Sequence, residues 1–245
     1  MAMTEKQKTC PVCLYPLQGY SMGEKNGYQL VACKGCGSVM VKPWMTPAEI
    51  EKFFGEVQPE IVHVSNPPAQ IAAMKKLIQK ITDNFAGRRF LDISCRQGYA
   101  VMAAKELGLQ AKGIDPHDFF IAFAKDKYTA DLFEHISVQD YAARGEQADV
   151  IFSIESFCEQ TDPEGYMAAL SKIIAPGGIL YLQEPDGNNF HLPKNFSRWR
   201  FVDPPLNFVY FSEKGMKSIL ARHGFKIQKS LFTWGPFMRL LAAKK

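Results

Sequence analysis

Short apolar runs alternate with helix-like patterns through most of the chain after Arg89. The apolar runs have the length of buried strands, and the segments between them carry apolar residues at helical spacing. Alternation of this kind favours an α/β fold, in which helices cover both faces of a doubly wound, mostly parallel sheet. Strands are expected at 90–93, 111–115, 135–138, 149–153 and 179–182, and helices at 98–109, 119–127 and 163–174.

The pattern changes on both sides of this region. After an expected helix at 212–222, two strands at 225–232 and 237–243 flank a Trp-Gly-Pro turn, which predicts an antiparallel hairpin at the edge of the sheet. Before Arg89, Thr46 is a plausible N-cap for a helix at 47–54, since Pro47 and Glu49 follow it. A second helical stripe covers 69–85.

Four cysteines near the N-terminus form two C-x-x-C pairs, Cys10 with Cys13 and Cys33 with Cys36, separated by nineteen residues. Each C-x-x-C turn delivers two thiolates to one side of a tetrahedral Zn²⁺, and this spacing is typical of a zinc ribbon. Two disulfides or four unrelated buried thiols are the alternatives, but the N-terminus lacks the apolar segment of a secretory signal and the paired spacing is that of a zinc ribbon. The sequence thus predicts a structural zinc module at 1–45, a helical linker region at 46–88 and a larger domain at 89–245.

Composition limits the classes of partner. With 29 basic and 25 acidic residues, the 245-residue chain carries a formal charge of +4, which is weak for a nucleic-acid-binding protein. No apolar run approaches the roughly 18 residues of a membrane span. Cys95 and Cys158 have no evident partner, and a reducing cytoplasm suits all six cysteines.

Acidic residues follow the first strands of the predicted sheet. Ligands of open parallel sheets bind at the carboxyl ends of the strands, where a loop after the first strand and an acidic residue after the second hold a nucleotide. Asp92 belongs to the first strand, and Asp115 ends the second, where it can accept from ribose hydroxyls. Asp140 follows the expected third strand and can accept from an adenine amino group.

Several blocks in order, among them FLDISCRQGYA, KGIDP, ADVIFSIESFCEQTDP and IIAPGGILYLQEPD, resemble class I S-adenosylmethionine (SAM)-dependent methyltransferases with an N-terminal zinc ribbon. The resemblance covers nearly the whole chain and implies a Rossmann-like fold. It also implies that Asp92 orients the loop after the first strand. Of the other residues, it places Ser94, Cys95, Arg96 and Gly98 near the methionine part of SAM, Asp115 near its ribose, and Asp140 and Tyr141 near its adenine. Pro116 is a further expected cofactor-binding residue.

The chain departs from that family at two places. The usual Gly-x-Gly-x-Gly is replaced by a segment with Ser94 and Arg96, so that only Gly98 remains. Arg96 either pairs with the SAM carboxylate or fills the pocket. A motif that often reads Pro-Pro-Glu-His has Leu206 and Asn207 here, and Asn207 can orient an acceptor but cannot take its proton at neutral pH.

The catalytic candidates are Glu155 and Glu159 after the fourth strand, His191 after the fifth, and Asn207. The aromatic-rich stretch 196–211 is either a lid over the acceptor or a partly buried connection. The sequence favours SAM-dependent methyl transfer to a small molecule, such as a sugar or a secondary-metabolite intermediate. One alternative is a catalytically impaired methyltransferase fold that serves as a binding or assembly protein. Another is an RNA methyltransferase whose zinc ribbon docks the RNA.

Overall fold

A computed structural model describes residues 9–61, 66–83, 85–190, 192–231 and 234–244. The chain forms two compact units, each built from separated segments. The first contains Met1–Met45, Ile154–Ala168 and Leu182–Leu240, and the second contains Thr46–Ser153, Ala169–Tyr181 and Leu241–Lys245. No helix in the described ranges is both long and apolar enough to cross a membrane. The domain boundaries expected at residues 45 and 88 remain predictions.

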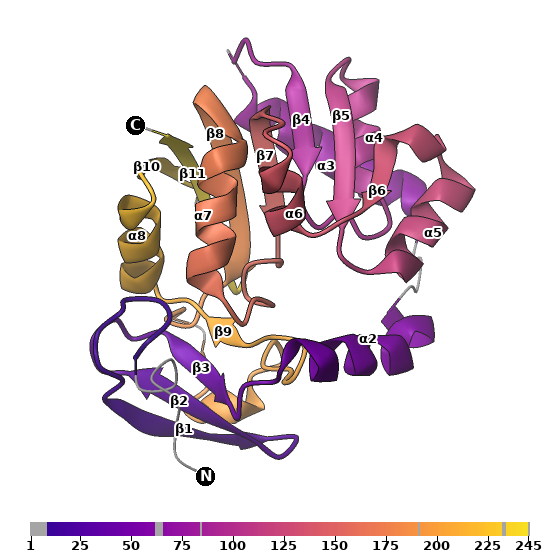
Figure 1. The fold of residues 1–245 in the computed structure, drawn as a ribbon. Coiled ribbons are helices and arrows are strands. Elements are labelled where there is room, and N and C mark those ends of the chain that lie inside the picture. Colours follow the sequence, from indigo (N-terminus) through magenta and orange to yellow (C-terminus); the bar gives the residue numbers. More distant parts are fainter. Residues whose placement is uncertain (1–8, 62–65, 84, 191, 232–233, 245) are drawn as a thin grey trace. The chain divides into compact units, whose positions relative to one another are not determined.

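The predicted α/β fold is confirmed. Seven strands form one sheet in the order β10-β11-β8-β7-β4-β5-β6, in which β4 pairs in parallel with both β5 and β7 (Figure 1). The strands are β4 (Arg89–Asp92), β5 (Gln110–Asp115), β6 (Phe133–His135), β7 (Ala148–Ile154), β8 (Ile174–Pro185), β10 (Phe225–Ser230) and β11 (Phe237–Lys244). The adjacent β10 and β11 are the predicted C-terminal antiparallel strands at the sheet edge.

Helices and short turns connect these strands close to the expected positions. The helices are α2 (Pro47–Ile61), α3 (Pro67–Ile81), α4 (Tyr99–Glu106), α5 (Asp118–Lys127), α6 (Val138–Ala143), α7 (Pro163–Ile173) and α8 (Glu213–Arg222), and the 3₁₀ turns are η1 (Ala130–Leu132) and η2 (Phe196–Arg198). The predicted cap of α2 is present: the Thr46 backbone N–H donates to the Glu49 carboxylate over 2.7 Å, and the Glu49 N–H donates to the Thr46 hydroxyl. Helix α3 ends earlier than expected, where the Thr82 hydroxyl donates to the Ile78 carbonyl.

The third strand lies earlier in the sequence than predicted. The expected strand covered 135–138, whereas β6 ends at His135 and Val138 begins α6. Ser137 is the N-cap of α6: the Asp140 N–H donates to its hydroxyl, and that hydroxyl donates to the Asp140 carboxylate. This reciprocal cap is strong enough locally to start a helix where the apolar pattern alone looked extended.

A small antiparallel sheet in the first unit has the order β1-β2-β3-β9 (Figure 1). Its strands are β1 (Gly19–Lys25), β2 (Tyr28–Cys33), β3 (Val39–Lys42) and β9 (Val209–Tyr210). Three strands therefore come from the cysteine-bearing N-terminus, whereas β9 comes from the distant C-terminal part of the chain. Val39 pairs with Tyr210 and Met40 with Val209.

The aromatic-rich stretch 196–211 supplies the core beside this sheet. Phe196, Trp199 and Tyr210 are buried together with apolar residues of β2 and β3. Phe208 and Phe211 are also buried in the first unit. Burial of these large rings contributes several kcal/mol to folding, at roughly 1.5–3 kcal/mol for each large apolar side chain. These five aromatic residues therefore pack in the core, which agrees with the interpretation of 196–211 as a partly buried connection.

Candidate active site and metal centre

The four N-terminal cysteines form a single buried cluster. The Sγ atoms of Cys10, Cys13, Cys33 and Cys36 all lie within 4.8 Å of one another, and the thiols are free rather than paired in disulfides. The distances from Cys10 to Cys36 and from Cys13 to Cys33 are both 3.8 Å. Four thiolates at about 2.3 Å from a tetrahedral Zn²⁺ would lie about 3.8 Å apart, so the cluster fits that ion.

Backbone turns fix the shape of both cysteine pairs. The Leu14 N–H donates to the Cys10 carbonyl, and the Gly37 N–H donates to the Cys33 carbonyl. A Cβ at position 35 would lie only 3.4 Å from the Sγ of Cys13, and Gly37 has a φ of +82°. Glycines thus leave room for the sulfurs and permit the left-handed turn that follows them. The donor set is closed, which suits a structural rather than a catalytic metal site.

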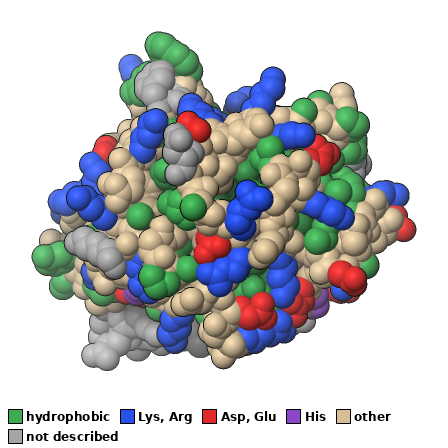
Figure 2. All heavy atoms as spheres, turned by 90° about the horizontal axis from the view of Figure 1, so that it is seen from above, with side chains coloured by type: hydrophobic (Ala, Val, Ile, Leu, Met, Phe, Trp, Pro, Cys, Tyr) green, Lys and Arg blue, Asp and Glu red, His purple; other side chains and the backbone are tan. Residues whose placement is uncertain are grey.

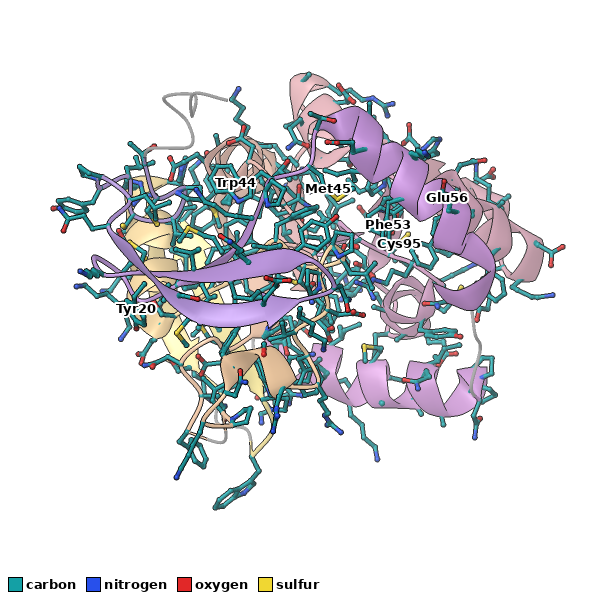
Figure 3. All side chains as sticks on the ribbon, turned by 90° about the horizontal axis from the view of Figure 1, so that it is seen from below. Tyr20, Trp44, Met45, Phe53, Glu56 and Cys95 are labelled. Atoms are coloured by element: carbon teal, nitrogen blue, oxygen red, sulfur yellow. The ribbon has the colours of Figure 1, made fainter. Side chains whose placement is uncertain are left out.

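The loop after β4 brings most of the predicted cofactor residues together in the second unit. Asp92 ends β4, and the Ser94 N–H donates to its carboxylate over 3.4 Å. The Cys95 N–H donates to the Ile114 carbonyl of β5, and the Gly98 N–H donates back to the Cys95 carbonyl. These bonds hold the loop against the carboxyl end of β5. Figure 3 labels Cys95 in this loop.

Arg96 preserves the backbone conformation that glycine usually provides there. Its φ is +45°, in the left-handed region, and Gly98 has a φ of +82° at the N-cap of α4. A Cβ at position 98 would lie 2.7 Å from the ring of Phe133, which explains why this glycine is needed. A non-glycine residue in this conformation costs on the order of 1 kcal/mol. The loop therefore keeps a glycine-like shape although Arg96 carries a long cationic side chain.

Asp115 lies at the centre of the candidate cofactor site. One carboxylate oxygen accepts from the Arg96 N–H and the other from the His117 N–H, each over 3.0 Å. Burial raises the pKa of Asp115 to about 6, although these amides and the Arg96 charge favour the ionised form. Burial likewise raises the pKa of Asp92 to about 7. Each Asp115 oxygen retains a lone pair that can accept from a ribose hydroxyl.

His117 and helix α2 add an aromatic surface beside Asp115. The rings of Phe54 and His117 lie 4.0 Å apart, and burial lowers the pKa of His117 to about 4, so its ring is neutral near pH 7. Figure 3 labels Phe53 and Glu56 on the same helix. No local pattern indicates the contact of Phe54 with His117, because it joins a helix to a loop more than sixty residues further along the chain.

The two residues predicted to contact the adenine, Asp140 and Tyr141, form hydrogen bonds within the protein. Asp140 is exposed and takes part in the cap of α6, whereas Tyr141 is buried and its hydroxyl donates to Glu146 over 3.1 Å. Pro116 follows Asp115, and its carbonyl lies 2.9 Å from Nε2 of His135. The adenine assignment of Asp140 and Tyr141 stays a prediction.

Two of the predicted catalytic residues, Glu155 and Glu159, lie in the loop after β7. Glu155 has a φ of +53°, and its N–H donates to the Gln183 carbonyl over 2.8 Å. Glu155 and Glu159 are both half-buried. Burial raises the pKa of the Cys158 thiol, and the charges of Glu155 and Glu159 raise that pKa further. His191 lies outside the described residues. The catalytic role of all four candidates stays a prediction.

Asn207 is part of a partly buried hydrogen-bond network in this unit. Its side-chain carbonyl accepts from the Cys158 thiol over 3.0 Å, and its amide donates to the Phe201 carbonyl. The neighbouring Glu184 is fully buried and accepts from the Phe157 and Cys158 N–H groups at 3.1 and 3.0 Å. Asn207 and Glu184 therefore hold the loop that carries Glu155 and Glu159.

Glu184 should make the stability of the protein depend on pH. Burial raises its pKa to about 8, so the folded state favours the protonated carboxyl. The stabilisation by this proton is complete below about pH 4.5 and is lost as the pH rises towards 8. We expect the free energy of unfolding of the wild type, relative to Glu184→Gln, to fall by about 2–4 kcal/mol between pH 5 and 8. Urea unfolding of both proteins at several pH values measures this difference, and parallel profiles would contradict it.

Comparisons with known proteins agree with this fold. Residues 68–230 match the model of a methyltransferase domain family, so the chain belongs to that family. It is 25% identical over 223 residues to a ubiquinone biosynthesis O-methyltransferase of Ruegeria sp. (strain TM1040). This match covers 77% of this chain and 89% of that protein. The predicted class, a SAM-dependent methyltransferase, is confirmed.

Two solved structures show the same fold at low sequence identity. The magnesium protoporphyrin IX methyltransferase of Synechocystis PCC 6803 with bound SAH has a TM-score of 0.62 and 14% identity, covering 82% of this chain and all of that one. The 1,6-didemethyltoxoflavin-N1-methyltransferase of Burkholderia thailandensis has a TM-score of 0.61 and 13% identity, covering 91% and 98%. Both are methyltransferases of small molecules by their names, and for this chain they show the fold alone.

Proposed function

We propose that this protein transfers the methyl group of SAM to a small-molecule acceptor, such as a sugar or a secondary-metabolite intermediate, in the cytoplasm. The observation that carries the proposal is the loop from Ser94 to Gly98. Arg96 takes the left-handed conformation of the glycine it replaces, and its N–H binds Asp115. The altered sequence therefore keeps the backbone on which cofactor binding depends, which favours an enzyme over an impaired fold.

Each residue of the cofactor site then has a chemical task. When bound, SAM supplies a methyl group on a positively charged sulfur, which reacts by in-line displacement. Asp115 accepts from the ribose hydroxyls, and Asp92 holds the loop through the Ser94 amide. The Arg96 guanidinium pairs with the carboxylate of the amino-acid part, in a charge-assisted contact. Cys95, Gly98 and Pro116 shape the surrounding wall, and Asp140 and Tyr141 face the adenine.

Methyl transfer needs positioning above all, and it needs a base only where the acceptor must lose a proton. Glu155 or Glu159 serves as that base, and His191 and Asn207 contribute to the acceptor site. Since both amide atoms of Asn207 bind neighbouring groups, its contribution is to hold the loop near Cys158 rather than to move a proton. A zinc ion on Cys10, Cys13, Cys33 and Cys36 is structural.

The RNA alternative has less support. The net charge is +4, and on the face shown in Figure 2 the Lys and Arg side chains are scattered, several of them next to Asp or Glu. Phosphate binding requires clustered cations, and it weakens steeply as salt rises. Retention of a structured RNA that falls between 50 and 200 mM salt would favour this alternative. Absence of such binding would exclude it.

The role of Arg96 can be tested with Arg96→Gly. Glycine suits the observed φ of +45°, so the variant should fold at least as well as the wild type. We expect its affinity for S-adenosylhomocysteine (SAH) to fall about tenfold, which is the loss of one charge-assisted contact. Affinity for 5′-methylthioadenosine, which lacks the carboxylate, should be unchanged. Calorimetry measures both ligands.

The outcomes of that experiment separate the alternatives. Equal loss for both ligands would contradict the carboxylate contact. Tighter SAH binding by the variant would mean that the Arg96 side chain obstructs the pocket. If the wild type failed to bind SAH at millimolar concentration, the proposed enzyme function would fail in favour of the binding or assembly protein.

A further inference from the structure

Helix α8 contacts both cysteine pairs of the metal site within the first unit. At its start, the Ser212 hydroxyl donates to the Cys36 carbonyl, and the Lys214 ammonium donates to the Gly35 carbonyl over 2.7 Å. At its end, the Arg222 guanidinium donates to the Val12 carbonyl, between Cys10 and Cys13, also over 2.7 Å. The helix therefore spans the two turns that supply the metal ligands.

Buried contacts strengthen the junction at the start of α8. The Ser212 N–H donates to the Ser38 hydroxyl over 3.1 Å, and both serines are buried. The Ser212 hydroxyl also caps α8 by accepting from the Gly215 N–H over 2.9 Å. A Cβ at position 215 would lie 2.3 Å from the Ser38 hydroxyl oxygen. The helix and the second cysteine turn are thus packed too closely to move independently.

A second path leads from the metal site to the loop after β7. Strand β3 begins three residues after Cys36 and pairs with β9, and the Val41 N–H donates to the Phe208 carbonyl over 2.9 Å. The N–H groups of Phe208 and Val209 in turn donate to the Cys158 carbonyl at 2.8 and 3.1 Å. Cys158 also binds Asn207 through its thiol.

We infer that the metal site orders the segments around the proposed acceptor site. A metal ion bound by the four cysteines holds β9 and α8 in place and, through Cys158, also holds the loop at 155–159. Thiols form only weak hydrogen bonds, so without a cation the four cysteines hold one another poorly, and metal loss releases the two turns. The hydrogen bonds of α8 and β9 then lose their fixed partners. The assignment of 155–159 to the acceptor rests on the proposed function, but the physical coupling does not.

Hydrogen exchange of the whole protein tests this coupling. The zinc-loaded protein is compared with protein treated with a zinc chelator and with treated protein to which Zn²⁺ has been restored. We expect metal removal to speed exchange at least about tenfold in peptides covering 205–222 and 155–160, with recovery on adding Zn²⁺. Peptides covering 89–135 should exchange as before, and the Kd for SAH should change less than about twofold.

Two lysines of α8 provide a matched pair of variants. Lys214 donates to the Gly35 carbonyl, whereas Lys217 pairs with Glu213 on the same helix. Lys214→Met should speed zinc release to a chromogenic chelator about three- to tenfold, and Lys217→Met should leave it within twofold. Faster exchange confined to residues 9–45 after metal removal, or equal release rates for the two variants, would overturn the inference.

These outcomes are separable from failure of the proposed function. If the protein binds no SAH but α8 still loosens on metal removal, the coupling holds and the enzyme proposal fails. If SAH binds and α8 keeps its protection without metal, the reverse is true.

Discussion

Replacing Cys36 with serine should abolish metal binding and unfold much of the first unit. The wild type is expected to carry about one zinc per chain, since its four buried sulfurs have the spacing of a tetrahedral site. In zinc-finger peptides the binding free energy is about 10–16 kcal/mol, as large as the whole stability of a typical domain. Even partial loss of it should lower the melting temperature by more than about 10 °C.

Metal analysis by mass spectrometry and differential scanning calorimetry check this expectation. Cys95→Ala is a suitable control, because Cys95 is buried in the second unit, outside the cluster. It should keep one zinc per chain even if it loses some stability to the cavity. A Cys36→Ser protein that retained stoichiometric zinc would contradict the assignment, as would fewer than six reactive thiols in the unfolded, metal-free wild type, which has six cysteines.

Replacing Asp115 with alanine should have the largest effect on cofactor binding. The change removes the carboxylate that two backbone N–H groups hold in place, together with its capacity to bind ribose hydroxyls. Hydrogen bonds to charged groups contribute about 1.5–3 kcal/mol each, so two such bonds to the ribose correspond to at least about a hundredfold loss of affinity. Titration calorimetry with SAH measures it.

Asp118 offers the matched control for this variant. It lies three residues further on, and its side chain is 80% exposed. Asp118→Ala should bind SAH as the wild type does. Since the pKa of Asp115 is about 6, wild-type affinity should also fall below pH 6, where the protonated carboxyl accepts fewer hydrogen bonds. Unchanged SAH affinity in a folded Asp115→Ala protein would mean that the ribose binds elsewhere.

The sequence predicts those parts of the structure that local signals determine. Asp92 lies in the first predicted strand and Asp115 ends the second, as the structure confirms, because short apolar runs identify β4 and β5. The cysteine cluster was predicted because two C-x-x-C pairs encode their own geometry. The strand predicted at 179–182 is present but longer than predicted. Strand β8 runs from Ile174 to Pro185 and includes a Pro-Gly-Gly segment whose composition is typical of a turn.

Contacts between distant segments could not be predicted in this way. The sequence predicts a role for Asn207 beside the acceptor, but it does not indicate the hydrogen bond with Cys158, which lies 49 positions earlier. Ser38 and Ser212, which join the metal site to α8, are 174 positions apart. No periodicity links such pairs, because their proximity follows from how the strands are ordered rather than from local preference. The left-handed conformation of Arg96 could not be predicted from the sequence either, because arginine rarely adopts a positive φ.

Strand β9 has a consequence for how this protein is made. All four cysteines are synthesised within the first 36 residues, but the fourth strand of their sheet consists of residues 209–210. At about 5–20 residues per second, a ribosome needs roughly 10–35 s to produce the intervening chain. During that time the edge of β3 that later pairs with β9 has no partner from its own chain. The nascent protein therefore carries an unpaired sheet edge until residues 209–210 have been made, and pairing of that edge with another chain is a hazard of its biosynthesis.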